Sequence, residues 1–210
     1  MTVRSLVFTG CGRSGTGWVA QVLAQAGFGA THEGVFQGRP GPDEQGPLLP
    51  DTVESSWFAA PFVQGVPLTE VAVVHLVRDP RDQIDSWLRA GVMSSPFVKR
   101  FLKRWCPEMM RVKDDPLRAA MTYWLRWNER VERLAGLRLR IEDLDVPGLT
   151  TALADSGRVD DTERLRQAVL GVPRNYNSKG GKPRRLEWDD LPFGLLKKGV
   201  MEYAREYGYW

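Results

Sequence analysis

Residues 7–18 read VFTGCGRSGTGW and join three kinds of sequence in one short stretch. An apolar, β-rich run ends at Thr9, a glycine-rich turn with hydroxyl groups and one cation, Arg13, follows, and an amphipathic helix begins at once. Such a turn directs several backbone N–H groups and a helix N-terminus at one point, which suits a phosphate group. The stretch therefore predicts a strand, a phosphate-binding loop and a helix in direct succession.

The loop is similar to a nucleoside-triphosphate P-loop over its first part only. Gly10 and Gly15 have the spacing of the G-x-x-x-x-G motif, but Thr16 and Gly17 stand where Lys-Ser/Thr would follow. Without that lysine and the magnesium-binding hydroxyl beside it, transfer of the β/γ-phosphates of ATP is poorly supported. Taken alone, the loop also fits an ordinary tight turn between a strand and a helix.

A second informative stretch is 71–86, which reads VAVVHLVRDPRDQIDS. Its first seven residues are mostly apolar and β-rich, which predicts a buried parallel strand. Asp79 is then expected to cap a helix whose first position is Pro80. Arg78 falls at the carboxyl end of the strand, where open α/β sheets bind ligands, and Ser86 lies about two turns into the helix. An arginine fork and a hydroxyl at one crevice suit a phosphate monoester.

Together the two stretches resemble the donor-binding segments of sulfotransferases that use 3′-phosphoadenosine 5′-phosphosulfate (PAPS). The first resembles their loop G-R-S-G-[ST], and the second matches their R-D-P-R-D-x-x-x-S segment without a gap. The residues that the resemblance assigns to the donor here are Arg13, Ser14, Gly15, Thr16, Gly17, Trp18, Arg78 and Ser86. It implies that Arg13 stabilises the leaving 5′-phosphate while backbone N–H groups of 14–17 hold it. It further implies that Arg78 and Ser86 bind the 3′-phosphate. Trp18 is expected either to stack on adenine or to be a core aromatic.

Two weaker matches extend the resemblance along the chain. Residues 137–144, LRLRIEDL, are similar to a family strand ending in Y-E-D-L, with Ile141 in place of the tyrosine that touches adenine. A basic segment at 175–192 resembles the lid over the 3′-phosphate, in which Lys179 and Gly180 are the matching residues. The same segment is equally typical of a solvated loop, because Gly, Lys and Arg gather in such loops.

A general base has to take the proton of the acceptor in sulfuryl transfer. Of the two histidines, His75 lies inside an apolar strand and is expected to be structural. His32 and Glu33 follow a short second strand, on the sheet edge that carries the loop. Tyrosylprotein and several carbohydrate sulfotransferases have a catalytic glutamate near this point. The resemblance therefore makes Glu33 the first candidate base and His32 the second. A polar dipeptide exposed at a strand end is the alternative.

Strands alternate with helices along the chain. Strands are expected at 3–9, 28–31, 71–77 and 137–141, and helices at 19–26, 80–90, 97–105, 116–134, 147–155, 161–170 and 193–207. This alternation predicts an α/β protein, a three-layer P-loop-type fold with a central parallel sheet flanked by helices on both faces. The length predicts a single domain, 1–210. Within it, 34–70 is the expected acceptor-side loop region, with a short helix over 52–62 that lines the acceptor pocket.

Composition limits the classes of function. Hydrophobic residues make up 42% of the chain and charged residues 26%, as is usual in a globular protein. The net charge of +3 and the isoelectric point near 9.0 fit a polyanionic donor as well as nucleic acid, and no nucleic-acid-binding motif is legible. We find no signal peptide, no membrane-spanning apolar stretch and no disulfide framework, so a cytoplasmic protein is expected. No His/Cys cluster has metal-ligand spacing, so no metal is expected.

Three functional hypotheses follow. The first is a PAPS-dependent sulfotransferase that transfers a sulfuryl group to a hydroxyl or amine of a small-molecule or carbohydrate acceptor. Adenosine 3′,5′-bisphosphate (PAP) is then the product. The second is a P-loop nucleotide kinase or hydrolase, and the third is a non-catalytic homologue that binds adenosine bisphosphate. The sequence indicates neither the acceptor's identity nor the oligomeric state.

Overall fold

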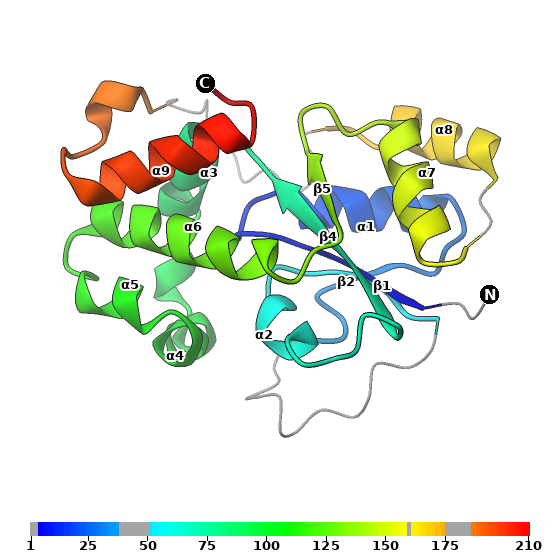
Figure 1. The fold of residues 1–210 in the computed structure, drawn as a ribbon, viewed down its shortest axis with the longest axis horizontal. Coiled ribbons are helices and arrows are strands. Elements are labelled where there is room, and N and C mark those ends of the chain that lie inside the picture. Colours follow the sequence, from blue (N-terminus) through cyan, green and yellow to red (C-terminus); the bar gives the residue numbers. More distant parts are fainter. Residues whose placement is uncertain (1–3, 38–50, 159–160, 175–185) are drawn as a thin grey trace.

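The computed structural model describes residues 4–37, 51–158, 161–174 and 186–210. Among these residues, five strands form a sheet in the order β2-β3-β1-β4-β5, and every neighbouring pair is parallel (Figure 1). The strands are β1 (Ser5–Thr9), β2 (Thr31–His32), β3 (Val53–Ser55), β4 (Val71–Val77) and β5 (Leu137–Arg140). The loop after β1 and the polar residue after β4 therefore lie at the same, carboxyl edge of the sheet.

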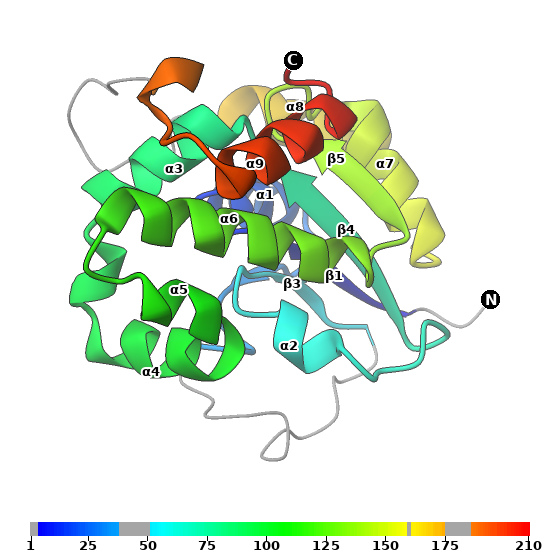
Figure 2. The same ribbon diagram turned by 60° about the vertical axis from the view of Figure 1, so that its left-hand side comes forward.

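Helices cover both faces of the sheet (Figures 1 and 2). One face carries α1 (Thr16–Gln25), α7 (Val146–Asp155) and α8 (Thr162–Gly171). The other carries α2 (Ala60–Val63), α3 (Pro80–Arg89), α4 (Pro96–Trp105), α5 (Pro107–Arg111), α6 (Pro116–Glu132) and α9 (Leu195–Glu206). The predicted three-layer α/β architecture is confirmed.

Strand β4 sends alternate side chains into two apolar cores. Those that pack on the side of α1 and α7 are Ala72, Val74 and Leu76, and those that pack on the side of α3 and α6 are Val71, Val73 and Val77. Because both faces of the strand are buried, its sequence is continuously apolar rather than alternating.

Aspartate caps begin several of the helices. Asp79 Oδ1 accepts the backbone N–H of Arg81 at 2.9 Å, and Pro80 occupies the first helical position, as expected. The same type of cap begins α6, α7 and α8, where the capping residues are Asp115, Asp145 and Asp161. Since these signals act within a few residues, the helices lie close to their predicted ranges.

The prediction of a short helix over 52–62 is wrong. Residues Val53–Ser55 form β3, which lies between β2 and β1, and helix α2 only begins at Ala60. Glu54 and Ser55 are polar, so this segment has too little apolar alternation to predict a strand. The strand forms because both of its edges are paired, with β1 on one side and β2 on the other.

The second strand begins later than expected. It covers Thr31–His32 rather than 28–31. The preceding chain passes through Gly27 and Gly29, whose φ angles are +92° and +62°, and an extended strand does not have positive φ. Within the expected acceptor-side region, residues 38–50 lie outside the described part of the chain.

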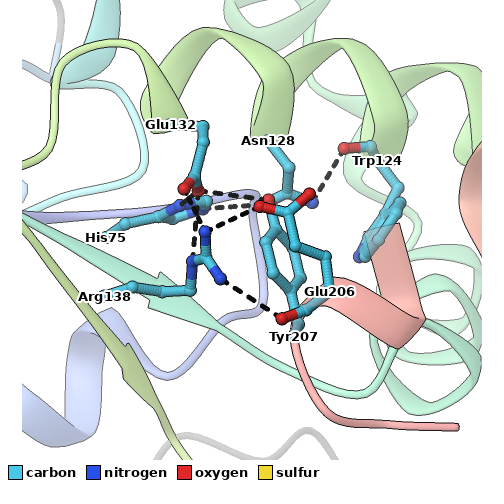
Figure 3. A network of polar contacts seen from close by, with 7 residues as sticks. All are labelled: His75, Trp124, Asn128, Glu132, Arg138, Glu206 and Tyr207. Carbon is cyan, nitrogen blue, oxygen red and sulfur yellow. Dashed lines mark hydrogen bonds and ion pairs between the residues drawn. The ribbon is translucent and has the colours of Figure 1, made fainter. Parts of the chain in front are cut away.

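A polar network joins the C-terminal helix to the sheet (Figure 3). His75 of β4 is fully buried, and its Nδ1 and Nε2 lie 2.8 Å from Glu132 Oε2 and 2.9 Å from Asn128 Oδ1, both on α6. Arg138 of β5 pairs with Glu132 and, at 2.9 Å, with Glu206 of α9. His75 therefore has the structural role that its place in an apolar strand predicts.

Candidate active site

The loop between β1 and α1 packs tightly against its neighbours. A Cβ atom on Gly12 would lie 2.5 Å from the ring of Trp87, and one on Gly15 would lie 2.5 Å from Ile141. Gly15 also has a φ of +96°, and Arg13 has a φ of +74°, which is uncommon for a residue with a side chain. The glycines therefore allow the loop to approach α3 and the end of β5, and Arg13 is held in a left-handed backbone conformation.

Buried side chains of α3 and α6 hold this loop from behind. Gln83 Nε2 donates to the carbonyl oxygens of Cys11 and Gly12, at 2.8 and 3.0 Å. Gln83 Oε1 in turn accepts the indole N–H of Trp124 at 2.9 Å. The hydroxyl of Tyr123 accepts the backbone N–H of Gly12 at 2.9 Å. These contacts fix the loop against α3 and α6.

Three of the predicted donor-binding residues meet beside the loop. Arg13 Nε donates to Ser86 Oγ at 3.0 Å, and Arg78 Nη1 donates to the carbonyl oxygen of Arg13 at 3.2 Å. Burial lowers the pKa of the Arg13 guanidinium, and the nearby charges of Arg78 and Arg89 lower it further. Cations that repel one another favour an anion bound between them.

Helix α1 presents its N-terminus at the same corner. It begins at Thr16 and has neither a side-chain cap nor an acidic residue in its first turn. The N–H groups of a first helical turn lack intrahelical partners, and the helix dipole adds partial positive charge. The N–H of Ser14 is already donated to the carbonyl oxygen of Cys11 at 3.0 Å. Of the four amides expected to hold a phosphate, those of Gly15, Thr16 and Gly17 are therefore the better candidates.

Of the two candidate bases, His32 lies beside Thr16 and Glu33 lies beside His32. His32 Nε2 is 3.3 Å from Thr16 Oγ1 and 3.5 Å from Glu33 Oε1. Burial raises the pKa of the Glu33 carboxyl to about 7, and the charge of Glu54 acts in the same direction. Burial lowers the pKa of His32, and the charge of Arg13 lowers it further. Glu33 is therefore able to accept a proton near neutral pH, and the lowered pKa makes His32 the weaker base.

Trp18 is a core residue of α1. The residue is 3% exposed, and its indole N–H donates to the carbonyl oxygen of Val172 at 3.1 Å. The guanidinium carbon of Arg174 lies 4.1 Å from the ring centroid. An adenine ring would have to displace this cation in order to stack there. Of the two expected roles of Trp18, the structure thus favours the core position over contact with adenine.

The residues of the expected lid are described in part. Lys179 and Gly180 lie outside the described residues. The described end of the segment contains Trp188, whose ring centroid is 4.9 Å from the guanidinium carbon of Arg81 on α3. This end of the segment therefore lies beside the N-terminus of the helix that carries Ser86.

Gln83, Arg89 and Glu54 are among the site residues that were not identified from the sequence. Gln83 and Arg89 could have been identified from the sequence, because they lie one turn on either side of Ser86 on the same predicted helix. Glu54, which is fully buried, could not have been identified from the sequence, because the strand that carries it was not predicted.

Two further observations concern metals and membranes. Within the described ranges, no three side chains of His, Cys, Asp or Glu gather in a way that would hold a metal ion. No helix in that part of the chain has both the length and the apolar character needed to cross a membrane.

The fold and the site define an α/β protein with a cationic, glycine-rich loop at the carboxyl edge of a parallel sheet. No protein-family model matches the chain, and no curated protein sequence matches it. Among solved structures, the crystal structure of mouse sulfotransferase SULT7A1 complexed with PAP is similar, with a TM-score of 0.44 and 18% sequence identity, covering 95% of this chain and 78% of that chain.

Proposed function

We propose that this chain is a PAPS-dependent sulfotransferase. The observation that carries the proposal is the meeting of Arg13, Arg78 and Ser86 beside the N-terminus of α1. Guanidinium groups and a hydroxyl suit a phosphate monoester, and a helix N-terminus suits a second phosphate group. PAPS carries both on one adenosine, as a 3′-phosphate and a 5′-phosphosulfate.

In the proposed reaction, the acceptor oxygen or nitrogen attacks the sulfur of the phosphosulfate. The bond from sulfur to the bridging oxygen breaks, its electron pair stays on the 5′-phosphate, and PAP leaves. Arg13 stabilises the charge that develops on the bridging oxygen, and the amides of Gly15 to Gly17 hold the phosphate in line. As in phosphoryl transfer, alignment and charge stabilisation supply the catalysis.

Glu33 is the proposed base that takes the proton of the acceptor. Its pKa of about 7 lets it be ionised at neutral pH and still accept a proton readily. His32, 3.5 Å away, is the second candidate. The proposed acceptor is a small molecule or carbohydrate that bears a hydroxyl or amine.

Donor preference is the first test. Calorimetric titration with PAP, and separately with ATP and Mg²⁺, compares the two classes of nucleotide directly. We expect PAP to bind more tightly, because the chain lacks the P-loop lysine but has cations placed for a second phosphate. Preference for ATP would overturn the proposal in favour of a nucleotide kinase or hydrolase.

Transfer is the second test. A panel of hydroxyl and amine acceptors incubated with radiolabelled PAPS should yield a sulfated product. A Glu33→Gln or His32→Ala variant that binds PAP normally but no longer transfers the sulfuryl group would identify the substituted residue as the base. A wild-type protein that binds PAP and sulfates no acceptor of the panel would instead support the non-catalytic homologue.

A further inference from the structure

Glu142 lies shortly after β5, at the carboxyl edge of the sheet. Val77, the last residue of β4, is paired in register with Arg140, the last residue of β5. Continuing this parallel pairing puts Glu142 beside Asp79, and Glu142 Oε1 accepts the backbone N–H of Asp79 at 3.0 Å. Glu142 has no role in the proposed reaction, yet it contacts the backbone of the donor site.

This hydrogen bond holds the peptide unit that joins Arg78 to Asp79. The N–H that Glu142 accepts belongs to that unit. Because a peptide unit is planar, holding its N–H also restrains its other end, which is the Cα atom of Arg78. The side chain of Arg78 leaves from this atom and donates from Nη1 to the carbonyl oxygen of Arg13 at 3.2 Å. Glu142 therefore restrains one of the arginines of the site through the backbone.

The segment that follows α9 holds Glu142 in turn. The hydroxyl of Tyr209 donates to Glu142 Oε2 at 2.6 Å. The guanidinium carbon of Arg140 lies 4.4 Å from the centroid of the Tyr209 ring, and Arg140 Nη1 donates to the carbonyl oxygen of Gly208 at 3.0 Å. An ionised carboxylate accepts hydrogen bonds at both oxygens. One oxygen of Glu142 thus binds the backbone after β4, and the other binds the segment after α9.

A second route joins the same segment to the side chain of Asp79. The rings of Trp210 and Trp188 meet edge to face, with their centroids 5.0 Å apart. The guanidinium carbon of Arg81 lies 4.9 Å from the centroid of Trp188, and Arg81 Nη2 donates to Asp79 Oδ2 at 2.7 Å. The backbone and the side chain of Asp79 are therefore both held by contacts that lead to residues 209–210.

We propose that Glu142 is a positioning residue that, held by Tyr209, orients Arg78 for the 3′-phosphate of the donor. The proposal rests on the proposed function in taking Arg78 to bind that phosphate. An arginine held in place before binding loses less conformational freedom when the phosphate arrives. Recognition of the donor then depends on Tyr209, which lies 67 residues after Glu142 in the sequence.

The test compares the binding of PAP with that of adenosine 5′-phosphate, which lacks the 3′-phosphate, by calorimetric titration. Glu142→Ala and Glu142→Gln remove the same charge, but glutamine retains a carbonyl oxygen that accepts the N–H of Asp79. We expect Glu142→Ala to bind PAP about threefold to tenfold more weakly than Glu142→Gln does, because it lacks this one hydrogen bond. The two variants should bind adenosine 5′-phosphate equally.

Asp143→Ala is the matched control. It removes the neighbouring carboxylate, which pairs with Arg140 at 3.1 Å, and it should not weaken the binding of PAP. Equal PAP affinities in Glu142→Ala and Glu142→Gln would overturn the proposal. A loss in Glu142→Ala that is the same for both nucleotides would overturn it as well, since a general structural change has that effect.

Tyr209→Phe tests the other contact of Glu142 and replaces Glu142→Ala if that variant does not fold. It removes only the hydroxyl, and it should weaken the binding of PAP but not that of adenosine 5′-phosphate. Added to Glu142→Ala, it should have no further effect on PAP affinity, because Tyr209 acts through Glu142. Wild-type PAP affinity in Tyr209→Phe, or losses that add in the double variant, would overturn the proposal.

Amide hydrogen exchange separates this proposal from the proposed function. The amide of Asp79 should exchange faster in Glu142→Ala than in Glu142→Gln, without any nucleotide present. Equal rates would overturn the proposal. Failure of the proposed function would show as a wild-type protein that binds PAP no more tightly than adenosine 5′-phosphate. The exchange rates would still decide whether Glu142 holds the peptide unit after Arg78.

Discussion

Arg13 contributes to the site through both its backbone and its side chain. A left-handed backbone costs a non-glycine residue about 1–2 kcal/mol, and Arg13 has this conformation at a φ of +74°. In it, the guanidinium reaches Ser86 and the carbonyl oxygen accepts a hydrogen bond from Arg78. Glycine would adopt the same backbone more easily but would supply no charge. The strain therefore points to a functional role for the guanidinium.

We expect Arg13→Ala to weaken PAP binding by about tenfold to a hundredfold, because hydrogen bonds to a charged group contribute about 1.5–3 kcal/mol each. Calorimetric titration with PAP measures the loss. Arg118→Ala, which removes an exposed cation of α6, is the control and should bind PAP like the wild-type protein. Equal affinities in the two variants would contradict the assignment of Arg13.

The pH dependence of activity is a second prediction for single residues. Glu33 has to lose its own proton before it can accept one, and burial raises its pKa to about 7. The value of kcat/KM should therefore be low in acid, rise with increasing pH through about 7, and level off above it. Initial rates at saturating PAPS across this range measure the profile. If the rise persists in Glu33→Gln and disappears in His32→Ala, the base is His32.

At the scale of elements, helix α3 connects the loop to the helical layer. Its cap at Asp79 fixes where the helix starts, and its successive turns then face the loop. Gln83 bonds the loop carbonyls, Ser86 accepts from Arg13, and the ring of Trp87 packs against Gly12. The position of the loop therefore depends on α3 as a whole.

Gln83→Leu should lower the free energy of unfolding by about 2–4 kcal/mol, because it leaves two loop carbonyls and the indole of Trp124 without their buried partner. PAP affinity should fall as well, since the loop loses its support. Urea denaturation and calorimetry measure the two effects. Gln167→Leu, an exposed glutamine on α8, is the matched control and should change stability by less than about 0.5 kcal/mol.

At the scale of the whole molecule, the C-terminal segment is joined to the site through the sheet. Arg138 of β5 pairs with Glu206 of α9 at 2.9 Å (Figure 3). The hydroxyl of Tyr209 donates to Glu142 Oε2 at 2.6 Å, and Glu142 Oε1 accepts the N–H of Asp79 at 3.0 Å. The end of the chain is thus connected through one carboxylate to the start of α3.

The ionisation of Glu132 makes the stability of the folded protein depend on pH in the acid range. The hydrogen bond from His75, with a second from Arg138, lowers the pKa of Glu132 to about 2. Its folded-state pKa lies below the ordinary 4.5, so Glu132 contributes stability above pH 4.5 that is lost as pH falls toward 2. Glu132→Gln should therefore cost about 1–3 kcal/mol at neutral pH and flatten the loss of stability in that acid range.

Urea unfolding at a series of pH values tests this prediction. Glu70→Gln, at an exposed position before β4, is the control and should follow the wild-type curve. A Glu132→Gln curve that falls in acid as steeply as the wild-type curve would contradict the role of this network.

The sequence by itself determined the features that depend on near neighbours. The strand, glycine-rich loop and helix at 7–18 and the capped helix after Arg78 follow from glycine, proline and aspartate acting within a few residues. The continuous apolar run at 71–77 required burial on both faces, which led to the parallel sheet. The placement of Arg78 and Ser86 at one crevice was also predicted, because Arg78 ends a strand at the carboxyl edge of the sheet and Ser86 lies two turns into the next helix.

Only the tertiary structure decided the features that depend on distant partners. Strand β3 exists because β1 and β2 pair with its two edges, and its own three residues carry no strand pattern. The hydrogen bond that holds Gly12 of the loop to Tyr123 joins residues that are 111 positions apart in the sequence. The hydrogen bond from Thr31 to Glu54 likewise requires β2 and β3 to be adjacent. Contacts of this kind arise from the packing of the whole chain, and short-range sequence patterns carry no information about them.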